Sequence, residues 1–277
     1  MQNSYDLNWD LKLNISTESV DYSEEDLQNY GYDPTPYVVL ERLIGLKILK
    51  KDDVIVDYGC GKGRISFFIN SQIGCRVIGI DHSEKLLEEA DKNLKSYGNC
   101  EDVIFIRSNA EDYKPDGANR FYFFNPFSTR IFSEVLKRIE ESFKRNPREI
   151  LIFFYYSTIE YKLYLPTEPR LELVESLYFS EEEINNQVSA KLDIFRFQSF
   201  DEWKMSHVAY WCHVFTVFLG VNVNVSHLKA FIFQNKFLNF FILLFKMQVS
   251  TCSRKSLYMG LSIYLFVQWS VNSKLFD

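Results

Sequence analysis

The sequence predicts an α/β protein with a doubly wound, mostly parallel sheet and an apolar C-terminal extension. Short apolar runs rich in β-branched and aromatic residues alternate with segments of helical periodicity between residues 54 and 155. Such alternation is typical of parallel strands connected by helices. Apolar residues make up 47% and charged residues 25% of the chain, which excludes a disordered or collagen-like protein.

The individual elements follow in order along the chain. Residues 1–30 are polar and acidic and are expected to form a surface arm or short helices. Pro34 and Pro36 bar a helix between them, and the run 38–49 predicts a helix after them. Strands are expected at 54–56, 77–80, 103–106, 121–124 and 150–155, with weaker ones near 171–174 and 192–197. Helices are expected at 65–69, 83–98 and 132–143, the second capped by Ser83 and ended by Gly98.

A glycine-rich turn directly follows the first expected strand. Residues 57–63 read Asp-Tyr-Gly-Cys-Gly-Lys-Gly. A dinucleotide fingerprint, GxGxxG, would need glycine at the position of Arg64, and a phosphate-binding P-loop would need Ser or Thr directly after Lys62. The residues therefore fit neither pattern, and the remaining pattern is DxGxGxG.

This pattern resembles the first motif of class I S-adenosylmethionine-dependent methyltransferases, and the resemblance extends over roughly residues 30–200. In that family the loop passes under the amino-acid part of the cofactor, where only glycine lets the backbone come so close. The resemblance implies a Rossmann-like fold and S-adenosylmethionine as cofactor. It implies cofactor contacts at Asp57, Gly59, Cys60, Gly61 and Gly63. A plain Gly-rich turn is the alternative interpretation.

The resemblance implies further cofactor contacts after the second and third strands. Asp81 comes 24 residues after Asp57 and would hold both ribose hydroxyls, since a carboxylate offers two acceptor oxygens. Asn109 would contact adenine, with Ala110 leaving room beside the ring. A charge at a helix N-terminus and an ordinary loop are the respective alternatives.

The fourth strand ends in Asn125-Pro126-Phe127. This segment resembles the (Asp/Asn)-Pro-Pro-(Tyr/Phe) motif of methyltransferases acting on nitrogen, in which the side-chain oxygen orients the target amine and the aromatic ring packs on the target. The resemblance implies catalytic roles for Asn125 and Phe127 and a substrate contact for Asn125. The chain has one proline rather than two, so Phe127 comes one place early, and an Asn-Pro turn is the alternative.

The segment ahead of the first strand is expected to fold over the cofactor as a lid. Its tyrosines, Tyr32 and Tyr37 among them, are expected to stack on a substrate or on adenine. A packed arm at the start of the domain is the alternative. These boundaries divide the chain into an arm or lid at 1–37, a methyltransferase domain at 38–203 and an extension at 204–277.

The resemblance implies a methyltransferase that moves a methyl group by direct displacement to an unidentified acceptor, with nitrogen as a candidate atom. The acceptor could be a small molecule, a protein or RNA. A non-catalytic cofactor-binding or scaffold protein is the alternative, and Arg64 argues against a nicotinamide-dependent dehydrogenase. His207, Cys212 and His213 cluster, but no second pair of ligands appears at zinc spacing, so no metal is expected.

The charge is unevenly distributed along the chain. Residues 1–204 carry −11 and residues 205–277 carry +5, with a single acid among the last 73 residues. The negative charge of the first part disfavours binding to a long nucleic-acid duplex. The extension is interpreted as a membrane-associated hairpin, an aromatic-rich interaction module or the product of a frame change, and membrane contact is not the favoured interpretation. An odd number of scattered cysteines and an acidic start without a signal peptide predict a cytoplasmic protein.

Overall fold

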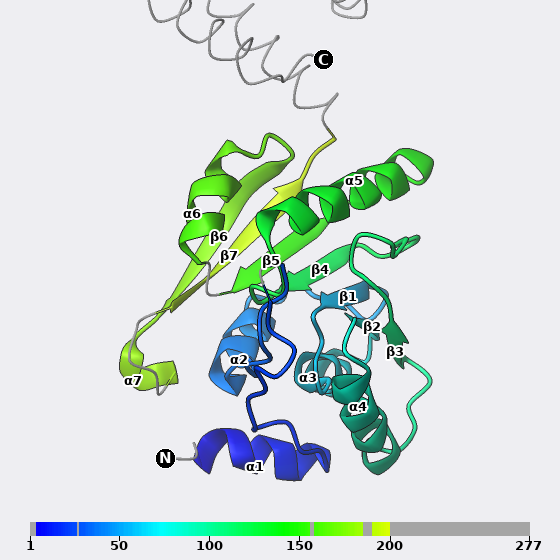
Figure 1. The fold of residues 1–277 in the computed structure, drawn as a ribbon, viewed down its shortest axis with the longest axis vertical. Coiled ribbons are helices and arrows are strands. Elements are labelled where there is room, and N and C mark those ends of the chain that lie inside the picture. Colours follow the sequence, from blue (N-terminus) through cyan, green and yellow to red (C-terminus); the bar gives the residue numbers. More distant parts are fainter. Residues whose placement is uncertain (1–3, 27, 156–157, 185–189, 200–277) are drawn as a thin grey trace, which may run out of the picture. The chain divides into compact units, whose positions relative to one another are not determined.

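The computed structural model describes residues 4–26, 28–155, 158–184 and 190–199 (Figure 1). The chain divides into two units, Met1–Trp203 and Lys204–Asp277, and all described residues belong to the first. The expectations for residues 204–277 therefore lie outside the described residues. No helix in the described part of the chain is both long enough and apolar enough to cross a membrane.

Within the described residues, seven strands form one sheet in the order β3-β2-β1-β4-β5-β7-β6 (Figure 1). The first five strands are parallel, while β7 runs antiparallel to both of its neighbours. This arrangement confirms the predicted doubly wound, mostly parallel α/β fold. The strands are β1 (Val54–Tyr58), β2 (Arg76–Asp81), β3 (Val103–Arg107), β4 (Arg120–Phe123), β5 (Leu151–Tyr155), β6 (Leu171–Phe179) and β7 (Ala190–Phe197).

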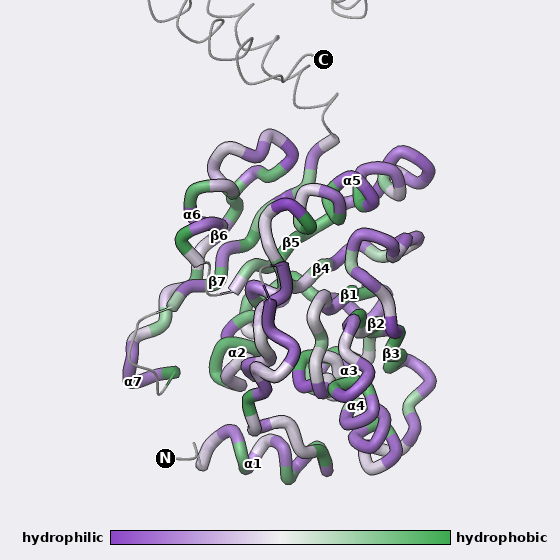
Figure 2. The backbone as a smooth tube through the Cα atoms, viewed as in Figure 1, coloured by the Kyte–Doolittle hydropathy of each residue, from purple (hydrophilic) through white to green (hydrophobic). Residues whose placement is uncertain are grey.

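Helices cover both faces of the sheet, and a separate cluster of buried apolar residues lies against each face. One cluster includes residues of α2 and α3, and the other includes residues of α5 and α6. Figure 2 shows hydrophilic and hydrophobic residues interspersed along α5, whose apolar side chains, among them Phe132 and Leu136, are buried. The helices are α1 (Ser4–Leu13), α2 (Tyr37–Gly45), α3 (Arg64–Ile73), α4 (Glu84–Tyr97), α5 (Thr129–Arg145), α6 (Ile159–Tyr164) and α7 (Glu181–Ile184), with a 3-10 turn, η1, at Leu165–Thr167.

Local sequence signals account for several helix ends. The Ser83 hydroxyl accepts a hydrogen bond from the Leu86 amide at 3.2 Å, and Gly98 ends α4 in the left-handed region at φ 119°. Both caps confirm the expectation for this helix. Helix α2 ends at Gly45 rather than running to residue 49, because Lys47 adopts a left-handed backbone with φ 57°.

Candidate functional site

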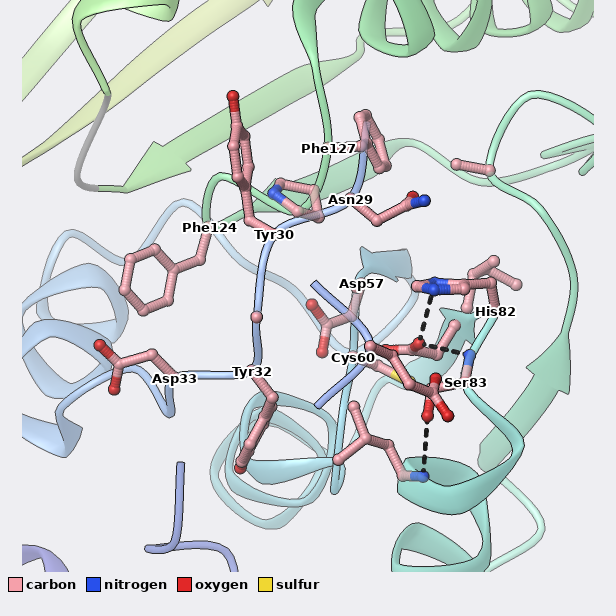
Figure 3. A pocket seen from close by; sticks show the side chains of 18 of the residues that line it. Asn29, Tyr30, Tyr32, Asp33, Asp57, Cys60, His82, Ser83, Phe124 and Phe127 are labelled. Atoms are coloured by element: carbon pink, nitrogen blue, oxygen red, sulfur yellow. Dashed lines mark hydrogen bonds and ion pairs between the residues drawn. The ribbon is translucent and has the colours of Figure 1, made fainter. Parts of the chain in front are cut away.

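A cavity of about 290 Å³ lies where the carboxyl ends of β1, β2 and β4 meet (Figure 3). Residues between 21 and 35 of the N-terminal arm line its other side. Ligands of open α/β sheets bind at this edge, where the strand order reverses on either side of β1. The fold thus brings the glycine-rich turn, the end of β2 and the segment after β4 to one place.

The glycine-rich turn packs tightly against both the arm and the segment after β4. Gly59, Gly61 and Gly63 all have positive φ angles, of 75°, 51° and 87°. A Cβ atom on Gly61 would lie 2.1 Å from a ring atom of Tyr32, and one on Gly59 would lie 2.5 Å from Cβ of Pro126. Both the backbone conformation and the contacts therefore require glycine here.

Replacing Gly61 with alanine is expected to cost more stability than replacing Gly98. Both glycines are left-handed, so each substitution should lose about 1–2 kcal/mol through the backbone. A Cβ on Gly98 meets no described atom within 4 Å, whereas on Gly61 it would strike the Tyr32 ring. Urea unfolding of both variants measures the difference, and an equal loss would show that the arm does not pack on this turn.

Asp57 is a buried carboxylate, and one of its oxygens lacks a hydrogen-bond partner among the described residues. It is 1% exposed, it lines the cavity, and its Oδ2 has no hydrogen-bond partner among the described residues. Burial, followed by the nearby charge of Asp81, raises the pKa of Asp57 to about 8. An ionised carboxylate is costly in such a place unless a cation or a donor pairs with it. The site therefore suits a ligand that brings an ammonium group.

Asp81 ends β2 and is held by two backbone donors. The Gly61 amide donates to Oδ2 at 2.8 Å, and the Ser83 amide donates to Oδ1 at 2.9 Å. Burial raises the pKa of Asp81, while these two bonds oppose the shift. Each carboxylate oxygen can accept a further bond, so the oriented carboxylate can still receive two hydroxyls.

The residues expected to contact adenine also line the cavity. Asn109 and Ala110 follow β3 and lie on its wall, and the Asn109 amide donates to the Asp112 carboxylate at 3.1 Å. Cys60 lines the cavity as well and is buried. The structure therefore brings the cofactor-binding candidates together around one cavity.

Arg64, the first residue of α3, anchors the N-terminal arm to the glycine-rich turn. Its guanidinium is almost fully buried and pairs with Asp6 at 3.0 Å and with Asp10 at 3.8 Å. It also donates to the Thr17 hydroxyl at 2.7 Å and to the Thr35 carbonyl at 3.2 Å. In the sequence Arg64 stands out only as the residue in place of a glycine, because nothing in the local pattern indicates partners 29 to 58 residues away.

The arm is also joined to the segment after β4. The Tyr30 amide donates to the Pro126 carbonyl at 3.2 Å, and the Ser128 amide donates to the Gln28 carbonyl at 2.7 Å. Lys62 of the glycine-rich turn donates to the Ser19 carbonyl at 2.9 Å. The arm therefore bridges two loops of the sheet edge and closes one side of the cavity.

The two tyrosines expected to contact a substrate differ in position. Tyr32 lines the cavity, packs on Gly61 and donates its hydroxyl to the Thr17 carbonyl at 2.8 Å. Tyr37 begins α2, is fully buried, and donates its hydroxyl to Asp10 at 2.6 Å. It does not line the cavity, because its ring packs over Arg64 and Phe68 in the core.

The segment after β4 also departs in part from its expected arrangement. Phe127 lines the cavity, with its ring packed edge-on against Tyr58 and Phe123. Asn125 is buried and left-handed at φ 41°, and it is not among the residues that line the cavity. Its Oδ1 accepts a hydrogen bond from the Thr158 amide at 3.3 Å, so the side chain is engaged next to α6. Within the described residues, no group of three His, Cys, Asp or Glu could hold a metal ion.

Parts of the chain are similar to known proteins. Residues 55–144 match a family model described as a methyltransferase domain. A histone-lysine N-methyltransferase, H3 lysine-79 specific, from Dictyostelium discoideum is 37% identical over 59 residues, which are 21% of this chain and 3% of that protein. A protein-lysine N-methyltransferase from Saccharolobus islandicus is 27% identical over 79 residues, which are 28% of this chain and 49% of that protein. The chain thus spans less than half the length of these relatives.

Among solved structures, an RNA methyltransferase from Salinibacter ruber in complex with S-adenosyl-L-homocysteine is similar over 59% of this chain and 92% of that chain. The sequence identity is 19% and the TM-score is 0.42.

Proposed function

We propose that this chain, whose residues 55–144 form a class I S-adenosylmethionine-dependent methyltransferase domain, transfers a methyl group from S-adenosylmethionine to an acceptor. The observation that carries the proposal is the pairing of two buried carboxylates across the glycine-rich turn. Asp57 lines the cavity and has a buried carboxylate oxygen without a hydrogen-bond partner among the described residues, and Asp81 is oriented by the turn itself. A ligand with an ammonium group and a ribose diol, as this donor has, suits both.

Each part of the cofactor has candidate residues in the cavity. Asp57 would accept from the ammonium of the methionine part, while Gly59 and Gly61 leave the space that side chains would fill. Asp81 would accept from the ribose hydroxyls, and Asn109 would lie beside the adenine. When bound, S-adenosylmethionine supplies an electrophilic methyl group, whose bond to sulfur breaks with the electron pair on sulfur as the acceptor's lone pair bonds to carbon.

The protein's contribution is mainly alignment and exclusion of water, because the sulfonium is already a good leaving group. The arm supplies one wall through Tyr32, and Phe127 supplies another. In the structure Asn125 lies in the turn after β4, and its side-chain oxygen accepts a hydrogen bond from the Thr158 amide. We therefore assign the orientation of the acceptor to the cavity walls rather than to the Asn125 oxygen.

A labelled-methyl assay tests the proposed activity. The protein is incubated with S-[methyl-³H]adenosylmethionine and fractionated cell extract, and acid-stable label is counted in the protein, RNA and small-molecule fractions. We expect label in one fraction with the wild type and little with Asp81→Asn. Cofactor binding without transfer to any fraction would favour the alternative of a non-catalytic binding protein.

Cofactor binding is expected to strengthen as the pH rises from about 6 to about 8. Because Asp57 has a raised pKa of about 8, the empty site favours the protonated carboxyl, and an ammonium ligand must displace that proton. The affinity should rise by up to about tenfold per pH unit. Equilibrium titrations with S-adenosylhomocysteine at three pH values measure this slope, which Asp57→Asn should flatten. An unchanged slope in the variant would assign it to another group.

The same pKa shift predicts how the stability of the ligand-free protein depends on pH. A carboxyl whose pKa is raised on folding stabilises the protein fully below its unfolded pKa, near 4, and this contribution is lost as the pH rises through about 8. The unfolding free energy of the wild type should therefore fall, relative to Asp57→Asn, between these pH values.

A further inference from the structure

We propose that Glu160 is a positioning residue for methyl transfer, which fixes the cavity wall formed by Phe127 from outside the cavity. The inference rests on the proposed function, in which the cavity walls orient the acceptor, and it names the residue that holds one of them. Glu160 lies on α6 and is not among the residues that line the cavity. It therefore acts through its neighbours in the arm and in the segment after β4.

The segment after β4 is held by the arm on one side. The Tyr30 amide donates to the Pro126 carbonyl at 3.2 Å, and the Ser128 amide donates to the Gln28 carbonyl at 2.7 Å. Phe127 lies between these two contacts in the sequence, and its wall therefore depends on where the arm lies.

Helix α6 holds the same segment from a second side. The Tyr161 hydroxyl donates to the Phe127 carbonyl at 2.7 Å, and both atoms are buried. Glu160 contacts the next turn of the chain, because its Oε1 accepts from the Thr129 amide at 3.1 Å and also from the Thr129 hydroxyl. Residues 127 and 129 are thus each bonded to a side chain of α6.

Glu160 also reaches the arm. Its Oε2 accepts from the Tyr30 hydroxyl at 3.0 Å, while Oε1 is bonded to Thr129. Tyr30 lines the cavity, and Figure 3 shows it on the same side of Asp57 as Phe127, with its ring directed away from Asp57. This ring packs against the apolar cluster that includes residues of α5 and α6. One carboxylate therefore fastens both the arm and the start of α5, which flank the Phe127 wall.

The charge of Glu160 strengthens these contacts. The bond from the Thr129 hydroxyl is the main cause that lowers the pKa of Glu160, so the carboxylate is ionised at neutral pH. Thr129 begins α5, and the N-cap residue Ser128 makes no side-chain capping bond. The Thr129 amide has no partner within the helix, and a carboxylate at this end interacts favourably with the helix dipole. Glu160 therefore fixes the point at which α5 begins.

The contacts of Glu160 do not include the residues assigned to the cofactor. Asp57 and Asp81 stand at the ends of β1 and β2, and Asp81 is held by backbone amides of the neighbouring loops. Loss of Glu160 should therefore leave the cofactor in place and let the wall at Phe127 move. A displacement of about 1 Å at a reacting centre can lower a rate about a hundredfold.

The test separates methyl transfer from cofactor binding in the full chain. Transfer is the initial rate with saturating S-[methyl-³H]adenosylmethionine and increasing amounts of the extract fraction that the wild type labels, and binding is measured by calorimetry with S-adenosylhomocysteine. Glu160→Ala removes all of the Glu160 bonds, and Tyr30→Phe removes one of them. Glu160→Gln keeps an oxygen for Thr129 and an NH₂ group that can donate to the Tyr30 oxygen. Glu141→Gln, which changes an exposed acid of α5 that pairs with Arg138, is the control.

Glu160→Ala should lower the maximal rate by about tenfold or more, with the affinity for S-adenosylhomocysteine within about twofold of the wild type. Tyr30→Phe should lower the rate by a smaller factor and should cause no further loss when added to Glu160→Ala, because the bond is already absent. Glu160→Gln should restore the rate to within about threefold of the wild type, since it can form the same bonds. Glu141→Gln should change it by less than about twofold.

An unchanged rate in Glu160→Ala, or a loss of rate matched by an equal loss of affinity for S-adenosylhomocysteine, would overturn the proposal. A rate of Glu160→Gln as low as that of Glu160→Ala would do the same, because charge rather than bonding would then matter. Urea unfolding checks that each variant is folded, and Tyr30→Phe tests the same contact if Glu160→Ala is not. A folded wild type that labels no fraction would instead reject the proposed function and, with it, the role of Glu160.

Discussion

Replacing Arg64 with glutamine is expected to lower both the stability of the protein and its affinity for S-adenosylhomocysteine. The substitution leaves Asp6 and Asp10 without their buried guanidinium partner, and breaking such a pair costs about 3–5 kcal/mol. It also removes the Arg64 hydrogen bonds to Thr17 and Thr35, which lie on either side of Tyr32 in the sequence and help to hold Tyr32 against the glycine-rich turn. Tyr32 forms one wall of the cavity, and loss of this wall should weaken cofactor binding by about tenfold or more.

Arg120 provides the matched control for this prediction. It is as deeply buried as Arg64 and pairs with Asp53 at 3.3 Å and with Glu149 at 3.0 Å. It begins β4, at the opposite end of the strand from the cavity. Arg120→Gln should destabilise the protein to a similar extent while leaving the affinity of the folded fraction within about twofold. Equal losses of affinity in the two variants would mean that Arg64 acts only through global stability.

Asp81→Asn is expected to have the largest effect on cofactor binding. The variant replaces a carboxylate oxygen by an NH₂ group, which cannot accept from both the Gly61 and the Ser83 amides and leaves one buried donor unpaired. The same change removes an acceptor for the ribose diol. Together these losses should weaken binding of S-adenosylhomocysteine by about a hundredfold or more, as is usual when charged hydrogen bonds are lost.

An exposed aspartate on the adjoining helix controls for the loss of charge. Asp91→Asn, on the solvent side of α4, should leave the affinity unchanged within about twofold. Equilibrium dialysis with labelled S-adenosylhomocysteine compares both variants with the wild type. Similar binding by Asp81→Asn and the wild type would remove Asp81 from the site.

Much of the sheet and most of the cofactor-binding candidates could be predicted because their signals are local. Apolar β-branched runs predicted β1 and β2, and capping residues predicted the limits of α4. The carboxyl ends of parallel strands share one edge, so Asp57 and Asp81 had to lie near each other. These features follow from short segments of sequence and from the fold they imply.

The wall formed by the arm could not be predicted in the same way, because it depends on partners distant in sequence. The pairing of Arg64 with Asp6 spans 58 residues, and that of Tyr37 with Asp10 spans 27. These contacts draw Tyr37 into the core and leave Tyr32 at the cavity. The hydrogen bond between the Thr158 amide and the Asn125 side chain spans 33 residues, so the motif at the end of β4 could not predict it either.

Calorimetric titration of the full chain with S-adenosylhomocysteine shows whether the cavity is a cofactor site. We expect one molecule to bind per chain, S-adenosylmethionine to compete for the same site, and Asp81→Asn but not Asp91→Asn to reduce this binding. No binding by a protein that unfolds cooperatively, and is therefore folded, would contradict the assignment of the cavity to this cofactor.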